Sequence, residues 1–328
     1  MSGRLVLLVS TPRIAPGLLT REAWVTLEQA YAVWALPDEP QALAIADAGI
    51  DVLEPPVAEM DDPPALARAL VACCEQAGES PVVWIGSSDG DPGLSESVAV
   101  EVTRLAEPPD VELLIASFDV PGARLLDVVA VMDRLRSTGG CPWDAEQTPT
   151  SLLPYLLEEA HEAIEAIESG DPTHIEEELG DLLLQVAFQA RVAAEHPTEP
   201  FDIDDVAGTL VEKLVRRHPH VFADVEADSA AAVEANWDAI KSQEKQHRTH
   251  PLEGVPLSLP SLARAQKYVA RLEKAGRPDL LDAAVAPGDL GAQLLERVRA
   301  ARAEGQDAEA ALRQTLQGLA AASEATHP

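Results

Sequence analysis

Residues 151–194 read SLLPYLLEEAHEAIEAIESGDPTHIEEELGDLLLQVAFQARVAA, and their pattern predicts two consecutive helices. Apolar residues recur at a helical period from 151 to 168, and Gly170 ends this first helix. Asp171-Pro172 then supplies an N-cap and a first helical residue for the second helix, which is expected to run to about Ala194. Because the connection is short, the two helices should pair as an antiparallel hairpin.

Five acidic residues lie on this hairpin at spacings that suit one shared site. They are Glu158, Glu159, Glu162, Glu178 and Asp181. The first three fall within about a 100° arc of their helix, and the last two share a face of the next helix. Two like charges about 4 Å apart repel by about 4 kcal/mol at an effective dielectric constant of about 20, so this cluster needs cations. Carboxylate ligands favour Mg²⁺ or Mn²⁺ over zinc, and Mg²⁺ commonly takes substrate phosphates as further ligands. The pattern therefore predicts a divalent-metal site for a phosphate substrate.

The acidic residues have two alternative interpretations. Charge runs on helices are more often solvated faces, but the leucines around these carboxylates predict that they border a buried face. Gly180 within the second helix costs about 1 kcal/mol against Ala, and close approach of a ligand or a neighbouring helix would explain it. Glu158-x-x-His161 also matches one element of di-iron carboxylate bundles, but the partner helix ends its motif in Asp181 instead of His, so this alternative is weak.

Basic and aromatic residues follow on the next two predicted helices. Lys213 and Arg217 are four residues apart and could reach phosphate oxygens from one helix face. Trp237 and Lys241 have the same spacing and would suit a base and a phosphate. Taken alone, each pair is better explained by a structural role, with positive charge complementing a helix C-terminus and Trp237 as a core residue.

The remainder of the chain divides into an α/β part and a helical part. Within residues 1–120, strands are expected at 5–9, 33–36, 82–85 and 113–116, and helices at 20–31, 65–77 and 96–105. The loop 86–93 could approach a ligand, but a flexible connection is the simpler interpretation because it has no phosphate-loop spacing. From about Leu125 the pattern is helical, with further helices at 202–217, 229–246 and 261–274 and a Pro-rich linker at 251–260. The Ala-rich stretch 277–328 predicts one or two solvated helices.

Composition limits the partners. The 328 residues suggest two domains, and the 24 basic against 56 acidic side chains give a formal charge of −32. Such a chain is poorly suited to nucleic acid or to an anionic membrane, and an anionic substrate would need a bound cation. The 3 cysteines have no CxxC spacing, and neither a signal-peptide core nor a membrane-spanning run is found, so a reducing cytoplasm is expected.

Several motifs, in the order in which that family carries them, closely resemble the MazG family of nucleoside triphosphate pyrophosphohydrolases over about residues 125–275. They are Gly140-Cys141-Pro142-Trp143-Asp144, Gln147-Thr148, Glu158-Glu159-x-x-Glu162, Glu178-x-x-Asp181, Lys213-Leu214-x-Arg216-Arg217-His218-Pro219-His220-Val221-Phe222 and Asn236-Trp237-x-x-Ile240-Lys241. The resemblance implies an all-α helical bundle that works as a dimer or higher oligomer. It also implies Mg²⁺-dependent hydrolysis of NTPs and dNTPs to the monophosphate and pyrophosphate, with Mn²⁺ as a substitute.

The resemblance also implies roles for individual residues. The metal ligands would be Glu159, Glu162, Glu178 and Asp181, and Glu158 would orient or deprotonate the attacking water. The nucleotide would be held by Lys213, Arg216, Arg217, Trp237 and Lys241. His161 stands where an aromatic residue is commoner in the family, which leaves the ligands intact.

The expected fold class is therefore α+β, with three parts. These are an α/β domain at 1–120, a MazG-type all-α domain at 125–275 and a helical tail at 277–328, in which no second Glu-Glu-x-x-Glu occurs. Residues 1–120 resemble half of a tetrapyrrole methylase-like domain, which implies no methyltransferase activity. The expected role is nucleotide-pool house-cleaning, and the alternative is a non-enzymatic helical dimer that senses nucleotides or regulates a partner.

Overall fold

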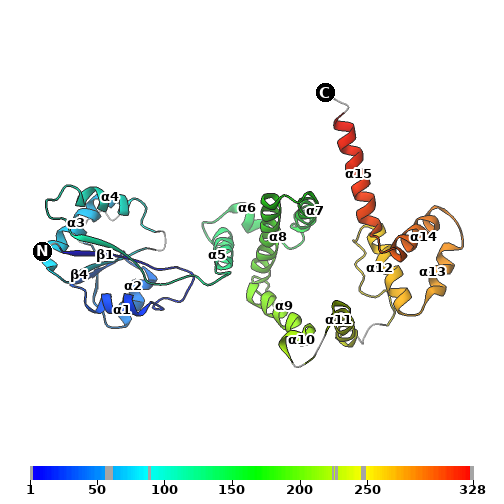
Figure 1. Ribbon diagram of the computed structural model, residues 1–328, viewed down its shortest axis with the longest axis horizontal. Coiled ribbons are helices and arrows are strands. Elements are labelled where there is room, and N and C mark those ends of the chain that lie inside the picture. Colours follow the sequence, from blue (N-terminus) through cyan, green and yellow to red (C-terminus); the bar gives the residue numbers. More distant parts are fainter. Residues whose placement is uncertain are drawn as a thin grey trace. The chain divides into compact units, whose positions relative to one another are not determined.

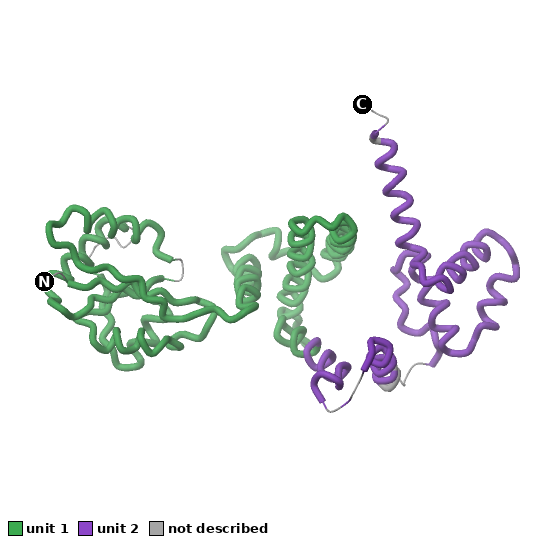
Figure 2. Tube along the Cα trace, viewed as in Figure 1, with its two compact units in different colours: residues 1–209 green, residues 210–328 purple. Residues whose placement is uncertain are grey.

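The structure is a computed structural model that describes residues 3–55, 62–87, 90–223, 225, 228–244 and 249–325. It divides into two compact units, Met1–Thr209 and Leu210–Pro328 (Figure 2). The first unit contains a parallel sheet and a group of helices, and the second is helical throughout its described part.

The described part of the first unit has a sheet of five parallel strands in the order β3-β2-β4-β1-β5. Figure 1 labels β1 and β4 of this sheet. They are β1 (Arg4–Val9), β2 (Ala32–Trp34), β3 (Val52–Leu53), β4 (Pro81–Ile85) and β5 (Asp110–Ile115). β1 lies between β4 and β5, with Leu5 opposite Val82 on one side and Val111 on the other. All of β4 is buried, as expected for a short aliphatic strand whose two faces are covered by helices.

Helices cover both faces of this sheet. On one face, α1 (Arg21–Glu28) and α2 (Pro40–Asp47) pack on a core that includes Val6 and Leu8. On the other face, α3 (Pro63–Ala77) and α4 (Leu94–Val102) pack on a core that includes Leu5 and Leu7. The predicted strands and helices correspond to all of these elements except β3 and α2. β3 is only two residues long, and the eight-residue helix α2 is apolar at every position from 42 to 46. Neither element therefore has a clear period in the sequence.

An ion-pair group joins the sheet to the first helix of the helical region, α5 (Arg124–Arg136). Arg13 follows β1, and its Nε lies 2.8 Å from a carboxylate oxygen of Asp127 on α5. Its Nη1 lies 2.7 Å from Asp119, which follows β5. The hydrogen bonds that Arg13 donates to Asp127 lower the pKa of that carboxyl group. The two segments that follow β1 and β5 thus hold α5 in place.

The predicted helical hairpin is present. After α5 come the short α6 (Pro142–Glu146), then α7 (Leu153–Ser169) and α8 (Pro172–Ala193), which pack closely together. Gly170 ends α7 in the left-handed conformation, with φ 73°. The Asp171 side chain caps α8 by accepting a hydrogen bond of 3.0 Å from the Thr173 amide. The local signals at this turn therefore act as predicted.

The surface of the hairpin differs from expectation. Leu156, Leu157 and Leu179 flank the acidic residues and were expected on a buried face, but their exposed fractions are 36%, 60% and 50%. The hairpin instead buries small residues such as Ala163 and Ala166 of α7, and Phe188 of α8 enters a core with α5. The expectation was therefore wrong for these three leucines in the single chain, whereas Leu182 and Leu183 are half-buried. Periodicity does not tell which part of an apolar stripe finds a partner.

The second unit begins within α9 (Ile203–Arg217). It continues through α10 (Pro219–Phe222), α11 (Ala230–Glu244), α12 (Ser261–Lys274), α13 (Pro278–Val285), α14 (Leu290–Ala303) and α15 (Ala308–Glu324). The expected end of the fourth helix at 246 lies outside the described residues. Residues 277–328 hold three helices instead of one or two, because Asp289 and Asp307 each cap a new helix after a glycine turn. None of the described helices is long and apolar enough to cross a membrane.

Candidate functional site

The hairpin brings three of the predicted metal ligands together. One carboxylate oxygen from each of Glu159, Glu178 and Asp181 lies within 4.8 Å of the other two. Glu159 comes from α7, and the other two residues come from consecutive turns of α8. Glu159 and Asp181 are half-buried, and Glu178 is buried with an exposed fraction of 9%. We call these three residues the acidic cluster.

Glu178 has an incomplete set of partners. Its Oε1 lies 3.2 Å from Nε2 of His174, one helical turn earlier on α8. Its Oε2 is buried and has no hydrogen-bond partner among the described residues. A buried carboxylate oxygen without a hydrogen-bond donor is unfavourable, so a ligand that contacted Oε2 of Glu178 would stabilise it.

The electrostatics of the acidic cluster agree with its geometry. The pKa of Glu159 is raised above its ordinary value, first by burial and then by the charges of Asp181, Glu162, Glu178 and Glu158. The other four predicted carboxylates are therefore close enough for their charges to act on Glu159. Among the described residues, the acidic cluster makes no ion pair with Arg or Lys. Glu158 and Glu162 are exposed and lie outside the group of converging oxygens, so their roles stay predictions.

The residues present fit a hard divalent cation. The donor set consists of carboxylate oxygens only, and one of these oxygens is buried without a partner. Such a set suits Mg²⁺ or Mn²⁺. A cation held here would also offset the repulsion that raises the pKa of Glu159.

Gly180 lies between Glu178 and Asp181 and was expected to allow close approach of a ligand or a neighbouring helix. No described atom outside the local helix backbone lies within 4 Å of the position that a Cβ would take. The neighbouring-helix explanation was therefore wrong, and the space beside Gly180 is open.

The predicted basic residues form a separate group in the second unit. Nη2 and Nε of Arg217 lie 2.5 and 3.2 Å from Oε2 of Glu244, and Nε of Arg216 lies 2.8 Å from its Oε1. Glu244 is the last residue of α11, while both arginines end α9. Hydrogen bonds from Arg217 and then Arg216 lower the pKa of Glu244 to about 2. One carboxylate therefore pairs with two predicted phosphate-binding residues.

Trp237 belongs to the same group. The guanidinium carbon of Arg217 lies 5.3 Å from the centre of the Trp237 ring, and the ring centres of His218 and Trp237 are 4.8 Å apart in an edge-on arrangement. Lys213 and Lys241 are half-buried and make no ion pair within the described part of the chain. The two lysines are thus the uncompensated cations of this group.

The sequence motifs do not include His174 or Glu244, and they include His218 without assigning it a contact. His174 had a usable signal, because a residue four positions before Glu178 shares its helix face. Glu244 stands three positions after Lys241 on the same helix, but its pairing with α9 depends on tertiary structure. The role of Glu244 as a counterion could not be predicted from residue spacing alone.

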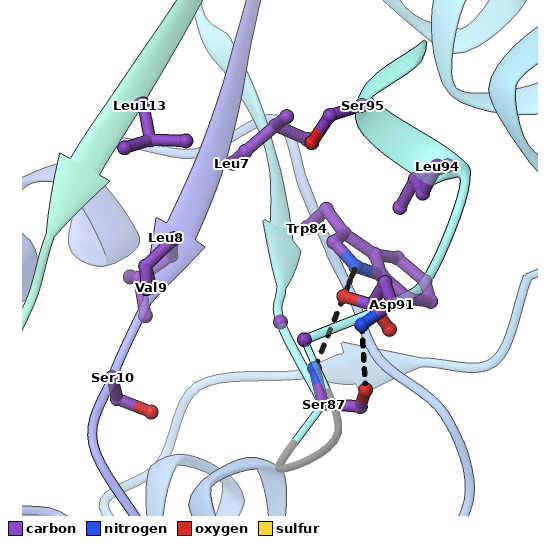
Figure 3. A pocket seen from close by; sticks show the side chains of 12 residues that line it. Leu7, Leu8, Val9, Ser10, Trp84, Ser87, Asp91, Leu94, Ser95 and Leu113 are labelled. Atoms are coloured by element: carbon purple, nitrogen blue, oxygen red, sulfur yellow. Dashed lines mark hydrogen bonds between the residues drawn. The ribbon is translucent and has the colours of Figure 1, made fainter. Parts of the chain in front are cut away.

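The structure also has a pocket of about 340 Å³ at the carboxyl ends of β1 and β4 (Figure 3). Part of the loop 86–93 borders it, while Ser88 and Asp89 lie outside the described residues. The carboxylate of Asp91 accepts hydrogen bonds from Nε1 of Trp84 at 2.8 Å and from the Ser87 amide at 3.1 Å. The loop connects β4 to α4 as expected, these bonds hold its described part together, and its flexibility stays a prediction.

Comparisons with known proteins identify the family. The model of the MazG nucleotide pyrophosphohydrolase domain matches residues 147–222, which contain the acidic cluster and both arginines. An uncharacterised 26.1 kDa protein of Streptomyces cacaoi is 50% identical over 233 residues, or 70% of this chain and 93% of that protein.

Two relatives are named nucleoside triphosphate pyrophosphohydrolase. The one from Mycolicibacterium smegmatis is 48% identical over 168 residues, or 51% of each chain. The one from Escherichia coli strain K12 is 43% identical over 152 residues, or 45% of this chain and 57% of that protein. The chain thus spans little more than half the length of these relatives. On these matches, together with the acidic residues of α7 and α8, the chain belongs to the MazG family.

Proposed function

We propose that this chain hydrolyses nucleoside triphosphates, both NTPs and dNTPs, to the nucleoside monophosphate and pyrophosphate. The observation that carries the proposal is the acidic cluster, in which three carboxylate oxygens converge without an Arg or Lys partner among the described residues. The names of the Mycolicibacterium and Escherichia relatives support the same reaction.

Mg²⁺ is the proposed cofactor, with Mn²⁺ as a substitute. The acidic cluster and Glu162 would hold it, and the orphaned Oε2 of Glu178 supports this assignment. When bound, a divalent cation supplies neutralisation of the triphosphate charge and a more acidic water. Burial and then the neighbouring carboxylate charges raise the pKa of Glu159, and a bound cation would offset both unfavourable contributions.

Glu158 is the proposed base. It neighbours Glu159 in sequence, and its charge acts on that residue. We propose that Glu158 accepts the proton of the water molecule that attacks the α-phosphorus. The new bond joins the water oxygen to that phosphorus, and the bond from the phosphorus to the bridging oxygen breaks. Pyrophosphate leaves with the electron pair of that bond, and Glu158 holds the proton.

Substrate binding is assigned to the basic group. The residues proposed to hold the nucleotide are Lys213, Arg216, Arg217, Trp237 and Lys241. Lys213 and Lys241 are free to meet phosphate, whereas the two arginines must exchange Glu244 for it or share it. Trp237 would stack on any base, so no base preference follows from it.

We also propose that the protein works as a homo-oligomer, a dimer in the simplest case. The exposed Leu156, Leu157 and Leu179 would be covered by a second copy. The formal charge of −32 supports the absence of a nucleic-acid partner, and three free cysteines suit a cytoplasmic location. The proposed parts remain an α/β domain at 1–120 without methyltransferase activity, a MazG-type domain at 125–275 and a tail at 277–328.

The test is to incubate the purified protein with Mg²⁺ and a panel of nucleotides and to separate pyrophosphate from orthophosphate. We expect pyrophosphate and the monophosphate in equal amounts, and none when EDTA is added. Oxidised and deaminated dNTPs in the panel test the house-cleaning role by comparison of kcat/KM values. Binding of nucleotides without any pyrophosphate would contradict the proposal and favour a non-enzymatic sensor.

A further inference from the structure

We propose that His174 is a positioning residue for the acidic cluster. Its imidazole would hold the carboxylate of Glu178 in the orientation that receives a divalent cation. This inference rests on the proposed function of the cluster, but it assigns a role to a residue outside the motifs of the family resemblance.

The contact is local and direct. His174 stands in the first turn of α8, four residues before Glu178, and its Nε2 lies 3.2 Å from Oε1 of that carboxylate. Residues four apart on a helix face each other, so the backbone itself sets this contact. The His174 side chain is 44% exposed and that of Glu178 is 12% exposed. The ring thus reaches a buried carboxylate from the solvent side.

Glu178 needs such a donor more than its neighbours do. It is the most buried member of the acidic cluster, and the terminal torsion of a glutamate is broad. Among the described residues, His174 supplies the contact to Oε1, and Oε2 has no hydrogen-bond partner. With Oε1 held, Oε2 is the oxygen left for a ligand. Hydrogen-bond partners of metal-ligating carboxylates act in this way, by orienting the ligand before the cation arrives.

The experiment measures Mn²⁺ binding to the full chain without nucleotide, by electron paramagnetic resonance of the free ion. We expect His174→Leu to raise the Kd for Mn²⁺ about tenfold. His174→Gln keeps an N–H donor that can reach a residue four positions on, so its Kd should return most of the way to the wild-type value. The matched control is His161→Leu, an exposed histidine next to Glu162 on α7, which should leave the Kd unchanged.

Two further readouts separate positioning from simple damage. The melting temperature without metal should be close to the wild-type value for both His174 variants, because the side chain is partly exposed in a first turn. Raising the Mg²⁺ concentration should restore the rate of pyrophosphate release by His174→Leu, because the loss lies in affinity. A Kd of His174→Leu within about twofold of the wild-type value would overturn the inference while leaving the proposed function intact. Wild-type protein that binds no Mn²⁺ would instead overturn the proposed function itself.

Discussion

The carboxylates of α7 and α8 and the arginines of α9 have opposite electrostatic situations. In the acidic cluster, like charges converge without Arg or Lys among the described residues, and the pKa of Glu159 is raised. In the basic group, Glu244 pairs with both Arg216 and Arg217, and its own pKa is lowered to about 2. The first group has no Arg or Lys counterion within the described chain, and the second already has a carboxylate counterion.

This difference indicates that the acidic cluster, and not the basic group, depends on a bound ligand. The acidic cluster is unfavourable by itself, so a cation from solution should bind it and stabilise the protein. The arginines are satisfied by the protein, so a phosphate gains from them only what exceeds their pairing with Glu244. Substitutions in each group test whether the acidic cluster depends on a cation and the basic group does not.

The largest expected effect comes from Glu178→Gln. Loss of the most buried charge of the acidic cluster should lower kcat for pyrophosphate release by about 100-fold or more, since it removes charge stabilisation that the cation needs. Steady-state kinetics with saturating Mg²⁺ measure it. The matched control is Glu177→Gln, an exposed neighbour on α8 that should keep the wild-type rate. Equal rates for the two variants would remove the acidic cluster from catalysis.

Lys213→Ala should act on binding. Lys213 makes no ion pair within the described part of the chain, so its full charge is available to phosphate. We expect the KM for nucleoside triphosphate to rise about tenfold, with a smaller change in kcat. Lys267→Ala, an exposed lysine of α12, is the control. An unchanged KM for Lys213→Ala would exclude the residue from substrate binding.

The stabilisation by Mg²⁺ should depend on pH. Because the pKa of Glu159 is raised in the folded state, its destabilising charge develops as the pH rises above the ordinary carboxyl range. We expect Mg²⁺ to increase the melting temperature by a few degrees at pH 7 and by less at pH 5. Calorimetry at both pH values, with and without EDTA, measures it. A larger gain at pH 5 would contradict the assigned cause of the pKa shift.

Glu244→Gln should give the smallest effect, and in the opposite pH range. The folded-state pKa of Glu244 is about 2, below its ordinary value, so its contribution to stability is present at neutral pH and is lost as the pH falls through the acid range toward 2. At pH 7 the variant should melt slightly below the wild type, and at pH 2 the two should converge. Equal melting temperatures of the variant and the wild type at all pH values would show that the ion pairs of Glu244 add nothing to stability, as is common for surface pairs.

The parts of the fold that were predicted are those with local signals. Gly170 and Asp171-Pro172 mark the hairpin turn, and the expected range 261–274 is the range of α12. β3 was missed because two residues give no period, and α2 was missed because it is apolar at every position from 42 to 46, which gives no helical period. The exposure of Leu157 was missed because burial depends on what covers a helix, which is not encoded in its own spacing.

The same distinction holds for the site. Spacing on two helices was enough to place Glu159, Glu178 and Asp181 in one group. The pairing of Arg217 with Glu244 joins the ends of two helices 27 residues apart in sequence, and only the folded chain brings them together. The contact between His174 and Glu178 lies within one helix turn, but its significance depends on the burial of the carboxylate.

The central claim is that the acidic cluster holds a divalent cation that meets the triphosphate. The most direct test is anomalous diffraction from crystals of the protein with Mn²⁺ and a non-hydrolysable nucleoside triphosphate. The account predicts an anomalous peak in contact with Glu159, Glu178 and Asp181 and with phosphate oxygens of the nucleotide. A well-defined nucleotide bound elsewhere, with no peak among these carboxylates, would contradict it.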